Sequence, residues 1–302
     1  MKGFTKVLFI AIIVFLVGRG FGQGPTEEYE RGGTSPELRQ RIQDLIASLP
    51  RAAPYDRDRS FAKSRAAREL IELGPPSVPF LVSAMKGEKA LQGGYLLMAM
   101  RVIGEIGVAK KADVVLPLCE FLESSVSDIS YHTGGDPARI RRVESEQACA
   151  IAIGEGAADY LARIGDPQAL ECLLGVIEAT QEKADLEYAT EERPAAQRLD
   201  ELYAAGHAGA VLEAAVAAIA ALPGAESHSA LEQLTQSTGI SVRVAARCAR
   251  AESIDGEAAA EYLREAIKTE KHPKAKERYQ GYIDEVISLR KVAAPEAGGK
   301  KK

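Results

Sequence analysis

The sequence predicts an all-α protein, an α-α superhelix of about five helix pairs with a capping helix at each end. No run of alternating apolar and polar residues reaches the length of a β-strand. Gly74 and Gly107, each placed after an apolar helical stretch, lie 33 residues apart, a repeat length typical of paired-helix arrays. Four stretches share one order of features, an apolar helix, a Gly turn and a second helix: 64–86, 95–122, 157–179 and 214–234.

The composition favours a helical fold and argues against sugar-binding and nucleic-acid-binding functions. Hydrophobic residues make up 46% of the chain, and many of them are Ala, which favours helices and lets them approach closely. The chain has no Trp and only 6% aromatic residues, so surfaces that stack sugars or bases are not expected. A net charge of -5 argues against nucleic acid as a partner.

The first 22 residues read as a signal peptide. Lys2 and Lys6 precede an unbroken apolar run of eleven residues, Val7–Val17, which is too short to span a bilayer as an ordinary helix. Gly20 and Gly22 then provide the small residues that a signal peptidase requires. We therefore expect an exported protein, periplasmic or extracellular, with no stable membrane insertion after cleavage. The alternative is an anchor that keeps residues 7–17 in the membrane.

Residues 23–35 form a polar linker, and the fold is predicted to span 36–290. Ser35 suits the N-cap of a first helix, because Pro36 at the first helical position and Glu37 in the first turn both favour a helix start. One face of this helix is apolar and the other is charged, which is typical of a capping helix.

The first two helix pairs are predicted at 57–86 and 91–123. Gly74 should end the first helix of one pair, and Gly107 the first helix of the next, because Gly adopts the left-handed conformation of a helix C-terminus at little cost. Two prolines after Gly74 prevent the helix from continuing.

Two insertions, 124–142 and 180–206, lengthen the spacing of the later repeats. A helix should begin at Pro137 in the first insertion, and Gly154 and Gly156 should kink or interrupt it. The second insertion is acidic, and we expect it to break at Pro194 and add a short helix around 199–203.

The C-terminal part should contain five further helices followed by a disordered tail at 291–302. The predicted helices are 210–222, 226–236, 241–252, 256–268 and 273–290.

Several of these segments resemble HEAT-type repeats. The resemblance is carried by the run from Leu161 to Leu174 (LARIGDPQALECLL), by Glu69–Gly74 with Val78–Leu81, and by Ile103–Gly107. It covers most of residues 57–270 and implies an armadillo-like superhelix that binds other macromolecules, here along a concave face made by the second helices. It implies no catalytic residue.

Helical spacing also predicts core positions, which are Leu73, Leu81, Ile103, Leu116, Ile164, Leu173 and Ile219. Cys119, Cys149, Cys172 and Cys248 lie in apolar helical stretches and are interpreted as small buried side chains. A disulfide between Cys119 and Cys172, on the second helices of adjacent repeats, remains possible in an exported protein.

The sequence contains no recognisable catalytic or metal site. His132, His207, His228 and His272 are expected in loops or at the surface, since none has the spacing of a metal ligand. We therefore expect no cofactor, no metal and no catalytic residue.

One loop is rich in reactive side chains and is the candidate binding site. Its residues are Tyr131, His132, Asp136, Arg139, Arg141 and Arg142. A helix N-terminus beside arginines favours an anion. The other interpretation is a plain connector with solvated arginines.

The sequence thus favours a non-enzymatic, exported scaffold that binds a protein partner through the concave face and the insertions. One alternative is a ligand- or anion-binding sensor, or an enzyme, that uses the Tyr131–Arg142 loop. Another is a membrane-tethered assembly factor that retains its N-terminal helix.

Overall fold

The computed structural model describes residues 34–50, 61–86, 93–110, 113–127, 137–189, 195–254 and 256–293. Every regular element in these ranges is a helix, which confirms the all-α prediction for this part of the chain. The predicted signal peptide, nearly all of the linker and positions 294–302 of the predicted tail lie outside the described residues.

The helices follow one another along the chain with short connections. They are α3 (Pro36–Ala47), α5 (Arg65–Leu73), η2 (Pro75–Ser77), α6 (Val78–Lys86), α7 (Gly94–Lys110), α8 (Val115–Val126), α9 (Pro137–Ile164), α10 (Ala169–Ala184), η3 (Asp185–Tyr188), α11 (Ala195–Ala221), α12 (Ala225–Leu234), α13 (Ile240–Glu252), α14 (Gly256–Thr269) and α15 (Pro273–Ala293).

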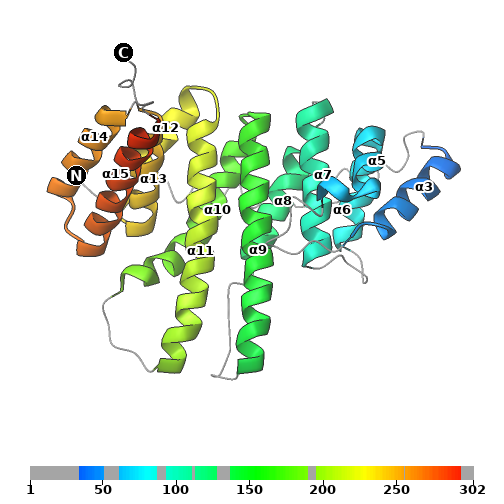
Figure 1. Ribbon diagram of the computed structural model, residues 1–302. Coiled ribbons are helices and arrows are strands. Elements are labelled where there is room, and N and C mark those ends of the chain that lie inside the picture. The colour runs from blue at the N-terminus through cyan, green and yellow to red at the C-terminus, as the bar shows by residue number, and fades with distance from the viewer. Residues whose placement is uncertain are drawn as a thin grey trace, which may run out of the picture.

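The odd-numbered helices from α5 to α15 form one layer, and each packs against the next in chain order (Figure 1). We call this the first-helix layer. The helices between them, α6, α8, α10, α12 and α14, each pack against the layer helix that follows in the chain. The same contact pattern therefore recurs from one end of the molecule to the other.

The predicted starts and stops at the N-terminal end are confirmed. The Ser35 side chain caps α3 by accepting a hydrogen bond from the backbone N–H of Leu38 at 3.2 Å. Ser64 caps α5 in the same way, with the N–H of Ala67 as donor at 3.1 Å. Gly74 ends α5 with a positive φ of 73°, which Gly adopts at less cost than other residues.

The prediction that Gly107 ends its helix is wrong. Helix α7 continues to Lys110, and Gly107 is buried inside it. A Cβ atom at this position would come within 3.0 Å of side-chain atoms of Val114 and Ile164. The glycine therefore serves helix packing and not helix termination.

The prediction that Gly154 and Gly156 interrupt their helix is also wrong, because α9 runs without a break for 28 residues. A Cβ on Gly154 would lie within 3.0 Å of Val211 in α11, and one on Gly156 would meet Met100 in α7. The two glycines allow α9 to pack closely against both neighbours in the layer.

The short helix predicted around 199–203 in the second insertion is not a separate element. Residues 199–203 belong to α11, a single helix of 27 residues that continues through Gly206 and Gly209. The N-terminal halves of α9 and α11 lie side by side and extend beyond the other helices (Figure 1). Gln147 on α9 donates a hydrogen bond to the backbone oxygen of Tyr203 at 2.7 Å, and the Tyr203 hydroxyl donates to Glu144 at 2.9 Å.

The later helices begin and end within three residues of their predicted bounds, apart from the merging of 210–222 into α11. Helix α15 extends to Ala293, so positions 291–293 are helical and were wrongly assigned to the tail.

The predicted core is correct at most positions. Leu81, Ile103, Leu173 and Ile219 are buried, and Leu73 and Ile164 are partly buried against the core. Leu116 is wrong, because its side chain is 60% exposed. The buried face of α8 is instead formed by residues on either side of it, including Val115 and Leu118.

A disulfide joins Cys119 on α8 to Cys172 on α10, with their Cα atoms 5.9 Å apart. Cys119 is buried and Cys172 is partly buried, and the pairing that the sequence left open is present. Cys149 and Cys248 take no part in this bridge. The bridge therefore links α8 and α10, the second helices of two adjacent pairs, which lie outside the first-helix layer.

One stretch of the described residues, Asp200–Ala221, is long and apolar enough to cross a membrane by length and composition, with a mean hydropathy of 1.5. Half of this stretch is buried within the fold. It belongs to α11, which packs against α9, α10 and α13, and a core helix of this kind has the same composition.

The burial of Leu173 and the exposure of Leu116 predict different effects of truncation. Leu173→Ala should lower the free energy of unfolding by about 2–5 kcal/mol, because it leaves a cavity in the core. Leu116→Ala should change it by about 0.5 kcal/mol at most. Urea denaturation of both variants checks this, and equal losses would show that the face of α8 is assigned wrongly.

Candidate binding groove

A groove of about 860 Å³ separates α11 from α15, and α13 also lines it. Both α11 and α15 pack against α13. Each of these three helices presents one face to the groove, with lining residues three or four positions apart. The lining is completed by Glu155 of α9 and by Glu187 and Tyr188 of η3.

The groove opens where two buried apolar clusters meet. The larger cluster extends from α3 to α13, and the smaller one combines residues of η3, α13, α14 and α15. Helix α13 contributes Ala245 and Ala249 to the larger cluster and Val244 to the smaller one. Because α13 is shared, it holds α11 and α15 apart and leaves the groove between them.

Small side chains line much of the groove. They are Ala210, Ala214, Ala217, Ala245, Ala249 and Gly281. A Cβ atom on Gly281 would have no neighbour within 4 Å, so the space beside α15 is open at this point. Small residues leave room for the main chain of a bound partner to approach the helices closely.

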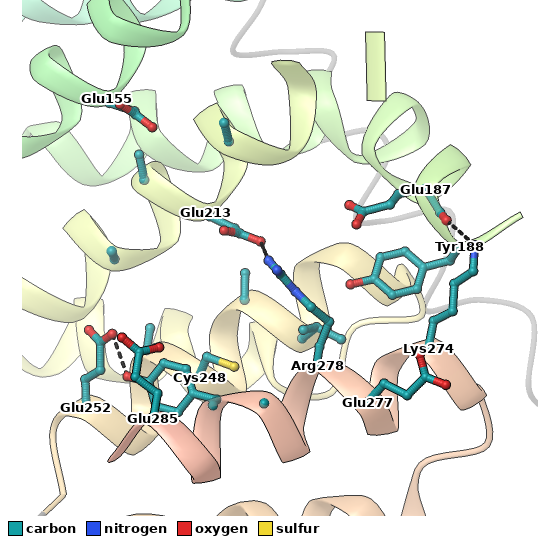
Figure 2. A pocket seen from close by; sticks show the side chains of 18 residues that line it. Glu155, Glu187, Tyr188, Glu213, Cys248, Glu252, Lys274, Glu277, Arg278 and Glu285 are labelled. Carbon is teal, nitrogen blue, oxygen red and sulfur yellow. Dashed lines mark hydrogen bonds and ion pairs between the residues drawn. The ribbon is translucent and has the colours of Figure 1, made fainter. Parts of the chain in front are cut away.

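The groove is strongly acidic. Six glutamates line it against one lysine and one arginine, which gives a net charge of -4 among the lining residues. The acids come from five different elements and surround the groove, as Figure 2 shows for Glu155, Glu213 and Glu252. The combined field of these carboxylates favours a positively charged ligand.

Three polar contacts connect the elements around the groove. Arg278 on α15 donates a hydrogen bond to Glu213 on α11 at 2.5 Å, which bridges the two walls (Figure 2). Tyr282 on α15 donates to Glu252 on α13 at 2.6 Å. The ammonium group of Lys274 donates to the backbone oxygen of Glu187 at 2.8 Å.

These surroundings shift the pKa values of the titratable groups. The charge of Glu213 raises the pKa of Arg278. Burial raises the pKa of the Cys248 thiol to about 12, and the charge of Glu213 adds to this shift. The thiol therefore stays protonated at neutral pH, which makes it a poor nucleophile and a poor metal ligand.

The described residues contain no group of three or more His, Cys, Asp or Glu side chains that could hold a metal ion. The six glutamates of the groove are spread around its walls and do not converge on one point.

A buried ion-pair network holds α15 against α13 beside the groove. The Glu270 carboxylate accepts hydrogen bonds from Arg243 at 3.0 and 3.2 Å and lies 3.7 Å from Arg247. It also accepts the backbone N–H groups of Lys271 and His272, just before α15. Burial alone would raise the pKa of Glu270, but the hydrogen bonds from Arg243 and the two N–H groups lower it to about 2.

A second hollow lies one helix further along the first-helix layer, between α7 and α9, with a volume of about 330 Å³. Glu155 lines both this hollow and the groove. Tyr160 donates a hydrogen bond to Glu105 at 2.8 Å inside it, and Arg163 lies 3.6 Å from the same carboxylate. This hollow is thus filled with internally paired charges.

Of the six residues in the loop predicted from the sequence, the structure describes only the three arginines. Tyr131, His132 and Asp136 lie outside the described residues. Arg139, Arg141 and Arg142 are exposed in the first two turns of α9, and Arg142 pairs with Glu146 at 2.8 Å. None of these three arginines lines the groove.

The prediction that all histidines lie in loops or at the surface is wrong for His207. This residue lies inside α11 and is only 2% exposed. Burial lowers its pKa to about 4, although a hydrogen bond to the backbone of Ser125 opposes part of the shift. His228 is exposed in the first turn of α12, as expected, and His272 precedes α15.

The sequence analysis did not identify the groove. Its residues come from helices that look like ordinary alanine-rich core helices in the sequence, and only packing brings their faces together. The expected partner surface was that of the second helices, whereas the groove lies on the first-helix layer. The sequence offers only a weak signal, such as Glu213 in α11 at helical spacing from Ala210 and Ala217, which many ordinary helices share.

Comparison of the chain with family models, with curated proteins and with solved structures gave no match. The assignment of function therefore depends on the residues and the geometry of the groove.

The Glu270 network predicts a specific pH dependence. Glu270→Gln should lower the free energy of unfolding by about 3 kcal/mol at pH 7, because Arg243 and Arg247, whose side chains are only 17% and 13% exposed, lose their carboxylate. The stability from Glu270 is present above its unfolded pKa of 4.5 and is lost as the pH falls toward about 2.

The difference between wild type and Glu270→Gln should therefore shrink between pH 4.5 and 2, as measured by urea denaturation at several pH values. Glu265→Gln is the matched control. Glu265 forms an exposed ion pair with Lys268, so its replacement should change the free energy of unfolding little. A difference that stays constant with pH would contradict the assigned role of Glu270.

Proposed function

We propose that this chain is an exported, HEAT-like helical-repeat scaffold without catalytic activity, and that it binds a protein partner through the groove between α11 and α15. The groove is the observation that carries the proposal, because it is large, lined by small apolar side chains and bordered by charges. Sites of this kind combine an apolar floor with a few polar groups that orient the ligand.

The repeated contact pattern supports the solenoid part of the proposal. Each layer helix packs on the next, as in repeat proteins whose units cannot bury their apolar faces alone. Such arrays use an extended surface for recognition. Here that surface is the first-helix layer, in place of the second helices expected from the sequence.

Export is supported by the sequence features of residues 1–22 and by the Cys119–Cys172 disulfide. Structural disulfides persist mainly in oxidising compartments outside the cytoplasm. The absence of a catalytic role is proposed because the groove's thiol is held protonated at neutral pH.

Gly281 allows a direct test, because a large side chain at this position would fill open space in the groove. We expect Gly281→Trp to reduce partner capture at least about tenfold, as loss of a well-packed contact does. The measurement is affinity capture from the native envelope or secreted fraction, with tagged protein expressed from the complete coding sequence and with quantitative mass spectrometry of what is retained.

Gly175→Trp is the matched control. Gly175 is exposed inside α10, and a Cβ atom there also has no neighbour within 4 Å. This variant should capture the same partners as wild type, and both variants should unfold at similar temperatures. Partners retained equally by Gly281→Trp and Gly175→Trp would refute the groove as the binding site.

A further inference from the structure

We infer that the occupant of the groove is a short basic segment of the partner, and that one of its Arg or Lys side chains replaces Arg278 at Glu213. This inference rests on the proposed function and adds the chemistry of the partner. Its basis is the charge of the lining together with the position of the Arg278–Glu213 pair.

The negative charge of the groove favours a partner segment with a positive charge. With a net charge of -4 among its lining residues, the groove attracts cations and repels phosphates and carboxylates. Glu277 and Glu285 extend the acidic lining along α15, and Glu252 extends it along α13. A segment with several basic residues would therefore meet carboxylates from more than one helix.

Arg278 shows where a basic side chain would bind. Its guanidinium group reaches from α15 to Glu213 on α11 and makes a charge-assisted hydrogen bond of 2.5 Å (Figure 2). The protein thus already places one guanidinium in the groove. A partner's arginine would form the same interaction with Glu213.

A cation of the partner can replace Arg278 in its ion pair with Glu213. The side chains of Arg278 and Glu213 are 52% and 50% exposed, so the bond between them contributes little to folding. When a partner's cation takes Glu213, Arg278 remains near Glu187, whose charge also acts on it. Exchange therefore leaves no buried charge without compensation.

The size of the groove limits the length of the segment. The lining residues of α15 run from Lys274 to Glu285, and the eleven steps between these two residues span about 16 Å of helix. An extended chain covers this distance with about five residues. The alanines and Gly281 leave space for the main chain and for small side chains between the basic ones.

The probe for this inference is a fluorescein-labelled peptide of nine residues in which Arg and Ala alternate, measured by fluorescence anisotropy at low ionic strength. We expect the triple variant Glu213→Gln, Glu252→Gln, Glu285→Gln to bind it about tenfold more weakly than wild type, as the loss of three exposed ion pairs implies. A peptide with Glu in place of Arg should not bind wild type.

The matched control is Glu171→Gln, Glu178→Gln, Glu226→Gln. These three exposed glutamates lie on α10 and α12, outside the groove lining, and their loss changes the net charge by the same amount. This variant should weaken binding by less than about twofold, because distant exposed charges are screened. Equal weakening in the two triple variants would overturn the inference.

Arg278→Gln gives the sharper test, because it should bind the Arg peptide about threefold more tightly once the internal competitor is gone. Arg264→Gln is its control, since Arg264 pairs with Glu257 and Glu261 on α14 and does not line the groove. If Arg278→Gln does not bind more tightly than Arg264→Gln, the exchange at Glu213 does not occur.

Two further outcomes separate this inference from the proposed function. If Gly281→Trp abolishes partner capture while the groove triple variant binds the peptide like wild type, the groove binds a partner that is not basic, and only the inference fails. If neither change affects capture or peptide binding, the proposed function fails as well.

Discussion

The close approach of neighbouring helices at glycines is the constraint on which the structure depends. The ring of Tyr160 on α9 covers Gly104 on α7, at a distance that a Cβ atom would not allow. Met100 on α7 covers Gly156 on α9 in the same way, and Val211 on α11 covers Gly154. These contacts are reciprocal, because each helix supplies a glycine or a side chain to the next, and they set the spacing of α7, α9 and α11.

The C-terminal end of the molecule is held together differently. Beyond α11 the layer continues through α13, whose two faces belong to different apolar clusters. The second cluster is fastened by Glu270, which binds Arg243 and the backbone at the start of α15. Glycines bring α7, α9 and α11 close together, whereas the buried charge of Glu270 holds α15 against α13. Between these two kinds of packing, α11 and α15 stay apart. The acidic groove is the consequence of this change.

The sequence predicted elements whose signals are local. Ser35 caps its helix and Gly74 ends its helix as predicted, because an N-cap and a helix end at glycine depend mainly on neighbouring residues. Gly107 and Gly154 were misread because the same residue type also permits close helix packing, and only the tertiary structure separates the two uses. The prediction that Leu116 is buried was wrong for a related reason, because an apolar residue on a short helix can lie outside the buried face. The groove could not be predicted, since it exists only where faces of α11, α13 and α15 meet.

The free energy of unfolding of Gly104→Ala, compared with that of Gly175→Ala, tests the close-approach account most directly. Alanine is favoured over glycine inside a helix by about 1 kcal/mol, so Gly175→Ala should stabilise the protein, because its Cβ meets open space. Gly104→Ala should destabilise it by about 1–3 kcal/mol, because the added methyl group must displace the buried Tyr160 ring. Opposite signs in urea denaturation would support the account. Stabilisation of both variants would contradict it, since α7 and α9 would then not be in close contact at this glycine.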